Sequence, residues 1–205
     1  MKIKICGMKN AENVEKISTF CPDMLGFIFY EKSPRNAFGL NIDFIKNFKA
    51  AQKVGVFVGE SIGNIRKICM ERDIKTVQLH GNESPEFCKE ARALGFTVIK
   101  AFQISDEGDL EKIGLYASVC DYALLDAKCD TYGGSGKKFC WDLLARYRWR
   151  LPFFLSGGIC ENDAKNILGI KNKMLFGVDL NSRFENELKL KDCDKLKKFI
   201  KEIRG

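Results

Sequence analysis

Residues able to take part in chemistry follow short apolar runs in this chain. Cys6 comes at the end of the run KIKIC, and Asp126 stands near the end of YALLDA. Free cysteine is among the most often buried residue types, so Cys6 either closes a core strand or presents its thiol to a ligand. A carboxylate in such a place costs free energy unless it is paired, solvated or functional. The local sequence leaves these alternatives open.

Two turns add a second kind of chemistry, the binding of an anion. The sequence SGG occupies 156–158 and GVDLNSR occupies 177–183, and both follow apolar residues. Backbone N–H groups at such turns, next to a helix N-terminus, commonly bind phosphate. The alternative for either turn is a tight connection that binds nothing.

Eight apolar runs, each followed by an amphipathic stretch, must position these residues. Continuous apolar runs are typical of parallel strands that are buried on both faces. Eight strand–helix units of about 25 residues each favour a TIM (βα)8 barrel, since an open doubly wound sheet usually has fewer strands. The expected strands are 2–6, 24–29, 54–58, 76–80, 98–102, 122–127, 152–156 and 173–178.

Residues suited to cap helices lie between the runs. Asn10, Asn41, Ser61 and Ser84 stand where side chains accept hydrogen bonds from the first turn of a helix, and Pro85 suits a first helical position. These signals predict where four of the helices begin.

The fifth unit carries the weakest helical pattern. Gly108 and Gly114 lower the helix propensity of the stretch 107–117, so we expect a weak or short helix there. A further amphipathic stretch, WDLLARYR, is expected to form the helix of the sixth unit. No linker or shift in composition divides the chain, which predicts a single domain over 1–205.

The barrel gives the polar residues a common place. Active sites of TIM barrels gather at the C-terminal ends of the strands. Cys6, the loop residue Arg35, the only histidine, His80, and Asp126 would all meet there with the two turns. Taken singly, Arg35 suits a surface charge, His80 a core histidine and Asp126 a capping or solvated carboxylate. Their convergence at one rim indicates a site.

The composition restricts the class of protein. The chain has 205 residues, of which 45% are hydrophobic and 30% are charged, as in ordinary soluble proteins. No apolar run approaches the roughly 20 residues of a membrane span. Lys2 and Lys4 interrupt any apolar segment of a secretory signal. We therefore expect a cytoplasmic protein without a membrane partner.

Cysteine usage and charge exclude further classes. Nine cysteines at irregular spacings, with one histidine, give a zinc site little to build on, and disulfide frameworks belong to small secreted domains. Much of the net charge of +7 lies in the last helical stretch, 189–205, with its lysines opposite an apolar face. No aromatic residues that could stack bases are interleaved there. An anionic small molecule suits this charge at least as well as nucleic acid.

Seven stretches match the motifs of one known family. They are KICGM (4–8), SPR (33–35), VGVFV (54–58), QLHG (78–81), LLDA with GGSGKKFCW (133–141), LSGGI (155–159) and GVDLNS (177–182). On these motifs the chain resembles phosphoribosylanthranilate isomerase of tryptophan biosynthesis along essentially its whole length. The resemblance implies a (βα)8 barrel that needs no cofactor and no metal. It also implies an Amadori rearrangement of N-(5-phosphoribosyl)anthranilate to 1-(2-carboxyphenylamino)-1-deoxyribulose 5-phosphate.

The resemblance implies a role for each candidate residue. Cys6 matches the general base, Asp126 the general acid, and Arg35 the partner of the anthranilate carboxylate. A carboxylic acid can protonate the furanose oxygen, and a thiolate can remove the C2′ proton of the resulting Schiff base. The remaining candidates are His80 and Asp179 for substrate binding, and Gly134, Gly157, Gly158, Asn181 and Ser182 for phosphate binding.

The chain departs from the family pattern at three places. Ser135 replaces a threonine, and Cys140 replaces an aspartate that would cap a helix. The segment Asn181–Ser182–Arg183 replaces a serine pair followed by glycine. Arg183 either adds positive charge to a phosphate site or points to solvent.

Two rival functions follow from the same residues. Another phosphosugar-binding (βα)8 isomerase, such as the Amadori isomerase of the histidine pathway, would carry an aspartate in place of Cys6. A non-enzymatic basic protein that binds nucleic acid would need a basic stripe or a known motif, and the sequence has neither. We expect a small phosphorylated aminosugar as the partner, no nucleic acid, and a monomer or a homodimer.

Overall fold

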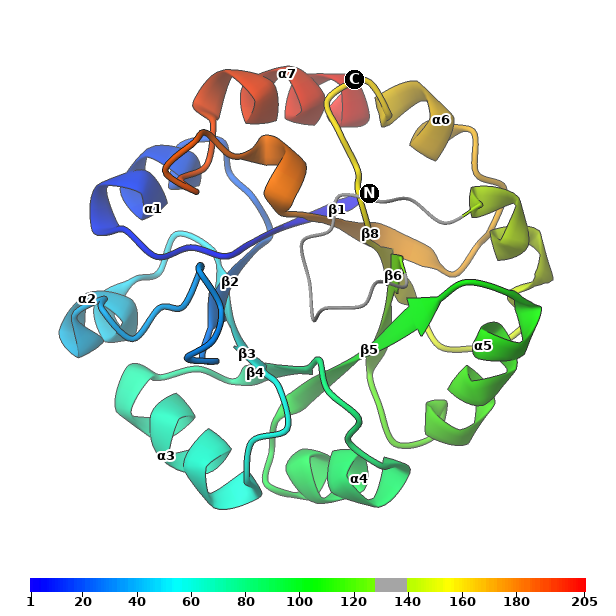
Figure 1. The fold of residues 1–205 in the computed structure, drawn as a ribbon, viewed down its shortest axis with the longest axis horizontal. Coiled ribbons are helices and arrows are strands. Elements are labelled where there is room, and N and C mark those ends of the chain that lie inside the picture. Colours follow the sequence, from blue (N-terminus) through cyan, green and yellow to red (C-terminus); the bar gives the residue numbers. More distant parts are fainter. Residues whose placement is uncertain (128–139) are drawn as a thin grey trace.

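Eight parallel strands close into a barrel in a computed structural model that describes residues 1–127 and 140–205 (Figure 1). The strands neighbour one another in chain order, and β8 pairs with β1 to complete the ring. They are β1 (Lys2–Cys6), β2 (Met24–Ile28), β3 (Gln52–Phe57), β4 (Thr76–Leu79), β5 (Thr97–Ile104), β6 (Tyr122–Ala127), β7 (Phe153–Leu155) and β8 (Leu175–Leu180). The predicted TIM barrel is confirmed.

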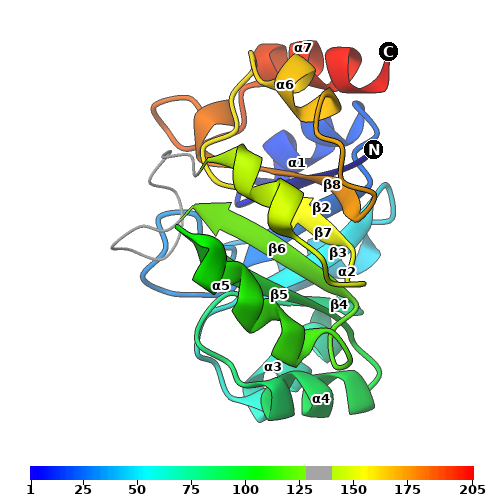
Figure 2. The same ribbon diagram turned by 90° about the vertical axis from the view of Figure 1, so that its right-hand side faces the viewer.

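Helices surround the barrel, with one or more helical segments following each strand (Figure 2). The α-helices are α1 (Ala11–Ser18), α2 (Ile42–Asn47), α3 (Ile62–Arg72), α4 (Pro85–Ala93), α5 (Glu107–Glu111), α6 (Ala164–Leu168) and α7 (Cys193–Arg204). Short 3₁₀ segments are η1 (Lys112–Tyr116), η2 (Trp141–Arg146) and η3 (Ser182–Phe184). None of the helices within the described residues combines the length and the apolar character needed to cross a bilayer.

The predicted helix starts are confirmed by their hydrogen bonds. The side chains of Asn10, Asn41, Ser61 and Ser84 each accept a bond from a backbone N–H in the first turn of α1, α2, α3 and α4. Pro85 occupies the first turn of α4, where its missing N–H has no intrahelical partner to lose.

The units after β5 and β6 have little α-helix. The expected short fifth helix is confirmed, since α5 spans 5 residues and continues as η1. Gly114 is needed there, because a Cβ would lie 2.5 Å from the Trp149 ring. The expected helix of the sixth unit is wrong in type: residues 141–146 form only η2, and no side chain caps it at Cys140.

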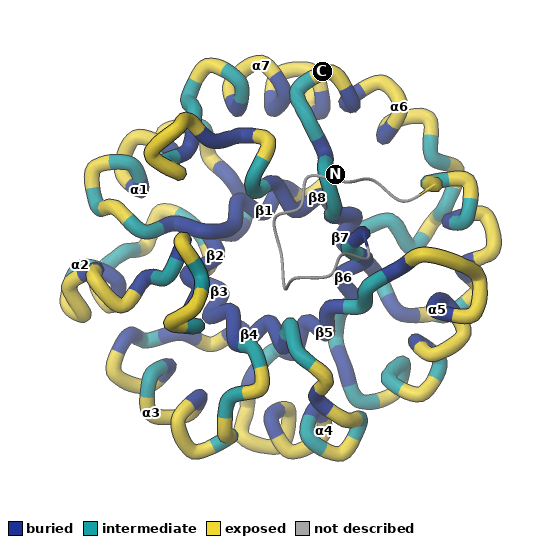
Figure 3. Tube along the Cα trace, in the orientation of Figure 1, coloured by how far each residue is buried: buried dark blue, intermediate teal, exposed yellow. Residues whose placement is uncertain are grey.

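The core has an outer and an inner layer. The outer layer lies between the strands and the helices, and the tube in Figure 3 shows helices buried toward the barrel and exposed on the opposite side. The inner layer fills the barrel and is apolar except for the residues described below. It consists of Cys6, Met24, Ile28, Val54, Val56, Ile99, Ala101, Leu124 and Phe154. Cys6 therefore faces the barrel interior, at the C-terminal end of β1.

Two strands extend beyond the predicted ends. β5 continues to Ile104 because its last residues pair with β6 as far as Ala127. β8 ends at Leu180 rather than 178, because it pairs with β1 as far as Ile5 and Leu180. Asp179, expected just after the strand, therefore lies within it and opposite Lys4.

Candidate active site

A buried ion pair lies inside the barrel next to Cys6. Side chains alternate along a strand, so Lys4 faces the interior as Cys6 does. Lys4 is fully buried, and its Nζ lies 2.7 Å from Oδ1 of Asp179. The sequence marked Asp179 as a substrate-binding candidate and gave Lys4 no role. In the structure the Asp179 carboxylate is already paired.

Charges on both sides of the Cys6 thiol influence its ionisation. Burial raises the pKa of Cys6 most strongly, and the negative charge of Asp179 raises it further. Lys4, through its charge and a hydrogen bond, and Lys191, through its charge, both lower this pKa. In the protein without substrate the net pKa of Cys6 is raised, because burial outweighs the two lysines. Burial is the largest single influence on the pKa of Lys4 and lowers it. The combined attraction to Asp179 and Cys6 is stronger still, so the pKa of Lys4 is raised. A permanent cation thus stands beside the thiol.

Glycines allow two loops to approach the end of β1. Gly7 has a φ of +82°, and a Cβ there would lie 2.9 Å from both Arg35 Cδ and Asn181 Oδ1. On β2, a Cβ at Gly26 would lie 2.8 Å from the Cys6 sulfur. Arg35, from the loop after β2, and Asn181, from the end of β8, are consequently neighbours of the residue that follows Cys6.

Arg35 belongs to a buried cluster of charges. Its Nε lies 2.7 Å from Oε1 of Glu185, and its Nη2 lies 2.8 Å from Oε2. Lys191 Nζ lies 2.6 Å from the same Oε1 and donates to Asn181 Oδ1 at 2.8 Å. The sequence analysis missed Glu185 and Lys191. The only feature of the sequence that could have indicated them is their opposite charge, six positions apart in the polar segment after β8.

His80 and Asp126 face each other across the ends of β4 and β6. His80 Nε2 lies 3.5 Å from Asp126 Oδ2, and His80 Nδ1 lies 2.7 Å from the Gln78 amide nitrogen. The Gln78 contact engages Nδ1, so Nε2 is the ring nitrogen that faces Asp126. The two predicted residues are therefore brought together.

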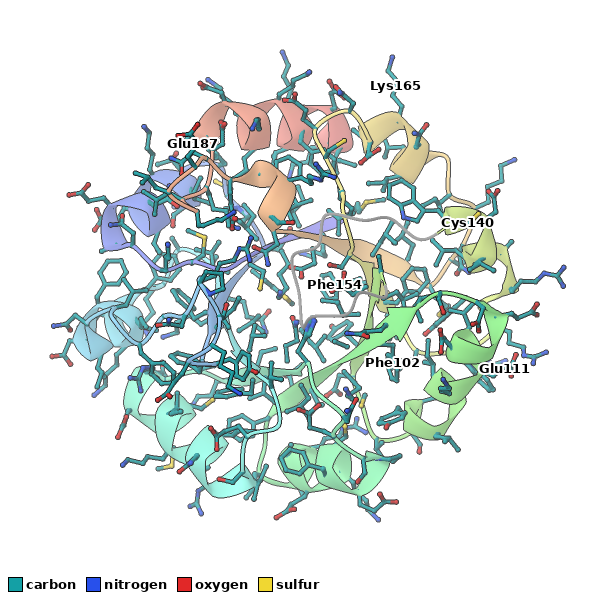
Figure 4. The ribbon with its side chains drawn as sticks, viewed as in Figure 1. Phe102, Glu111, Cys140, Phe154, Lys165 and Glu187 are labelled. Carbon is teal, nitrogen blue, oxygen red and sulfur yellow. The ribbon has the colours of Figure 1, made fainter. Side chains whose placement is uncertain are left out.

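A cavity of about 320 Å³ opens beside this pair. His80, Lys100, Phe102, Tyr116 and Asp126 are among its lining residues. The combination of an aromatic wall with a carboxylate and a cation is typical of a small-molecule site. Figure 4 shows Phe102 on β5, and Phe154 nearer the centre of the barrel.

The loop that carries His80 is held by Glu83. Oε1 of Glu83 accepts hydrogen bonds from the backbone N–H groups of Gly59, at 2.9 Å, and of Gly81, at 3.1 Å. Lys100 Nζ lies 3.2 Å from Oε2 of Glu83 and donates to the Gly81 carbonyl at 2.7 Å. The loops after β3 and β4 are thereby linked to each other and to the middle of β5, which fixes the backbone next to His80.

The turn after β7 packs closely against Asp126. Gly157 and Gly158 have φ angles of +85° and +67°. A Cβ at Gly157 would collide with the Ala127 backbone nitrogen and lie 3.0 Å from Asp126 Oδ1. Glycine at 157 therefore lets the predicted phosphate turn pack against the end of β6.

The other phosphate candidates are only partly placed. Asn181 directly follows β8, and Ser182 begins η3. Arg183 is exposed in that segment. Gly134 and Ser135 lie outside the described residues. Among the described residues, no group of three or more His, Cys, Asp and Glu side chains is arranged to hold a metal ion.

All the described candidates share the same end of the barrel. The pKa of Asp179 responds to residues on both sides of this end of the barrel. Burial has the strongest influence and raises the pKa, as does Asp126, whereas Lys4 and His80 lower it. One side holds Cys6 and Arg35, and the other holds Asp126 and His80. The site thus contains a thiol beside a cation, a carboxyl group beside an imidazole, and two turns of the kind that can bind an anion.

Comparison with known proteins identifies the family. The family model described as N-(5'phosphoribosyl)anthranilate (PRA) isomerase matches residues 3–202. An N-(5'-phosphoribosyl)anthranilate isomerase of Phocaeicola vulgatus is 41% identical over all of this chain and 98% of its own length.

Solved structures agree with the sequence match. A phosphoribosyl anthranilate isomerase of Thermotoga maritima, an enzyme described as dimeric, is 35% identical, covers 100% of this chain and 99% of its own, and has a TM-score of 0.86. A phosphoribosyl anthranilate isomerase structure in complex with reduced 1-(o-carboxyphenylamino)-1-deoxyribulose 5-phosphate is 30% identical with a TM-score of 0.84, over 100% of this chain and 99% of its own.

Proposed function

The chain belongs to the N-(5'-phosphoribosyl)anthranilate isomerase family, and on this premise we propose which side chains carry out its reaction. It is an isomerase of tryptophan biosynthesis that converts N-(5'-phosphoribosyl)anthranilate to 1-(2-carboxyphenylamino)-1-deoxyribulose 5-phosphate. The rearrangement opens the sugar ring and then moves a proton from C2′. It therefore needs one acid and one base.

Asp126 is the proposed acid. Its proton passes to the furanose oxygen as the C1′–O bond breaks, and the lone pair of the anthranilate nitrogen forms the C1′=N bond of a protonated imine. His80 Nε2, 3.5 Å from Asp126 Oδ2, then stabilises the carboxylate that results. General acid catalysis of this kind contributes about 10²–10⁴-fold to a rate.

Cys6 is the proposed base. Its thiolate removes the C2′ proton, the electron pair of that C–H bond forms a C1′=C2′ double bond, and the imine nitrogen becomes the amine of an enolamine. Tautomerisation of the enolamine gives the ketone. The Lys4 ammonium beside the sulfur favours the thiolate, and the protonated imine of the bound substrate adds a second positive charge. A metal is unnecessary for this step, because the substrate's own nitrogen accepts the electron pair.

Substrate recognition is assigned to the two sets of loop residues. Arg35 binds the anthranilate carboxylate, and the turns at 156–158 and 181–182, with Gly134, bind the phosphate. Asp179 acts through Lys4 rather than by touching the substrate, because its carboxylate is committed to that ion pair. The convergence of Cys6 and Asp126 at one mouth, in a chain of this family, is the observation that carries the proposal.

Rescue of a tryptophan auxotroph tests the proposal. A strain that lacks this step should grow without tryptophan when it expresses the chain, and it should fail to grow with the Cys6→Ser or Asp126→Asn variant at equal protein level. Growth with either variant would contradict the assignment of acid and base.

The remaining expectations also belong to the proposal. We infer a single domain over residues 1–205, catalysis without a cofactor, and a cytoplasmic location. The described dimeric state of the Thermotoga maritima enzyme supports a homodimer over a monomer. Neither nucleic acid nor a membrane is a proposed partner.

A further inference from the structure

The Arg35 guanidinium presents two edges, and only one of them is occupied. Glu185 binds the Nε–Nη2 edge, with Nε to Oε1 at 2.7 Å, Nε to Oε2 at 3.0 Å and Nη2 to Oε2 at 2.8 Å. Among residues 1–127 and 140–205, Arg35 Nη1 makes no hydrogen bond with any side chain or backbone group. The edge formed by Nη1 and the second Nη2 proton has the fork geometry that suits another carboxylate.

The aliphatic part of Arg35 is held as firmly as its head group. Its Cδ packs over Gly7, the residue after Cys6, where no Cβ would fit. The backbone N–H of Arg35 bonds Ser33 Oγ at 3.2 Å, and Asn36 pairs with Ile28 of β2 in an isolated bridge. Arg35 is 7% exposed. The side chain therefore lies at the mouth with little freedom to turn.

Glu185 is itself fixed by a second cation. Lys191 Nζ lies 2.6 Å from its Oε1, and residues 185 and 191 form an antiparallel bridge. Both side chains are buried. Burial raises the pKa of Glu185, but the hydrogen bond from Arg35 and the charge of Lys191 lower it more, so the carboxylate stays ionised.

We propose that Glu185 is a positioning residue, which holds one edge of Arg35 so that the other edge faces the substrate's ring carboxylate. The proposal rests on the role given to Arg35 under the proposed function. A merely electrostatic role for Glu185 makes the opposite prediction, because loss of a negative charge near the site would strengthen the binding of an anion.

The test is the affinity of Glu185→Gln for two probes, measured by titration calorimetry. One probe is reduced 1-(o-carboxyphenylamino)-1-deoxyribulose 5-phosphate, and the other is the same compound without the ring carboxylate. The variant should bind the first probe about tenfold more weakly, a loss of about 1.4 kcal/mol. It should bind the second within about twofold of the parent. Unchanged or tighter binding of the first probe would overturn the proposal.

Three further variants separate the possible failures. Glu187→Gln makes the same charge change on the exposed rim, where Figure 4 shows Glu187, and should alter neither affinity. Glu185→Asp keeps the negative charge but shortens the side chain, so this variant should also bind the carboxylated probe more weakly. If Glu185→Gln does not fold, Glu185→Asp takes its place in the test. Arg35→Ala should lose the preference for the carboxylated probe, and Glu185→Gln should add nothing in that background. If Arg35→Ala keeps the preference, the proposed function of Arg35 fails; if only the Glu185 variants keep it, the positioning role fails.

Discussion

Removal of the Asp179 charge should strongly destabilise the fold. Lys4 and Asp179 lie 2.7 Å apart and are 0% and 5% exposed, so Asp179→Asn leaves an ammonium buried without a counter-ion. At an effective dielectric constant of about 20, attraction across that distance is about 6 kcal/mol, which is close to the cost of burying the two ions. Breaking a buried pair costs about 3–5 kcal/mol. For a chain of this size that corresponds to a fall in Tm of about 6–20 °C.

Urea unfolding at neutral pH measures this loss. A double variant, Lys4→Met with Asp179→Leu, removes both charges and should recover most of the stability, because an apolar pair needs no counter-ion. Asp73→Asn is the exposed control: Asp73 pairs with Lys49 at 3.0 Å and Lys75 at 3.3 Å and lies 3.8 Å from Lys53, but its own side chain is 40% exposed, so water replaces the lost charge and the cost should be far smaller. If Asp179→Asn unfolds no more easily than Asp73→Asn, the reasoning about the buried pair is wrong.

Three further perturbations have defined outcomes. Gly157→Ala should lower the free energy of unfolding by at least about 1–2 kcal/mol, the cost of a left-handed conformation, and should lower kcat by displacing the end of β6; unchanged kcat would refute the contact with Asp126. Arg183→Gly should leave KM unchanged at physiological ionic strength, where a Debye length of about 8 Å screens the exposed charge; a severalfold rise with a shallower salt dependence would place Arg183 in the phosphate site. The pKa of Asp109 is lowered from 3.8 to about 2 by bonds from Lys112 and Ser105, which outweigh burial, so its stabilisation is present above pH 4 and lost as the pH falls toward 2. Asp109→Asn should therefore flatten the acid limb of stability between pH 4 and 2, and an unchanged limb would exclude that role.

The sequence predicts the fold well because its signals are local. Apolar runs of strand length and capping residues such as Ser84 act within a few positions, and the structure confirms both. The helix expected after β6 is the exception. Cys140 offers no capping hydrogen bond there, and residues 141–146 form only the 3₁₀ segment η2. The period of the apolar residues alone does not distinguish these two helix types.

The candidate site is predicted in part, for a physical reason. Residues at strand ends, such as Cys6 and Asp126, are found once the barrel is assumed, because topology alone brings strand ends together. The partners of these residues depend on tertiary contacts: Arg35 and Glu185 are 150 positions apart, and Lys4 meets Asp179 only through the closure of the barrel by β1 and β8. The position of Lys4 inside the barrel could have been predicted from the sequence, because residues two positions apart on a strand lie on the same face and Lys4 precedes Cys6 by two.

The most direct test of the central claim is kinetic, with substrate carrying deuterium at C2′. Cys6→Ser and Asp126→Asn should each lower kcat by about 10²-fold or more. Proton removal from C2′ should limit the rate in Cys6→Ser, which should show a full primary isotope effect, whereas ring opening should limit Asp126→Asn, which should show almost none. Near-parental kcat in either folded variant, or an isotope effect confined to Asp126→Asn, would contradict the assignment of Cys6 as base and Asp126 as acid.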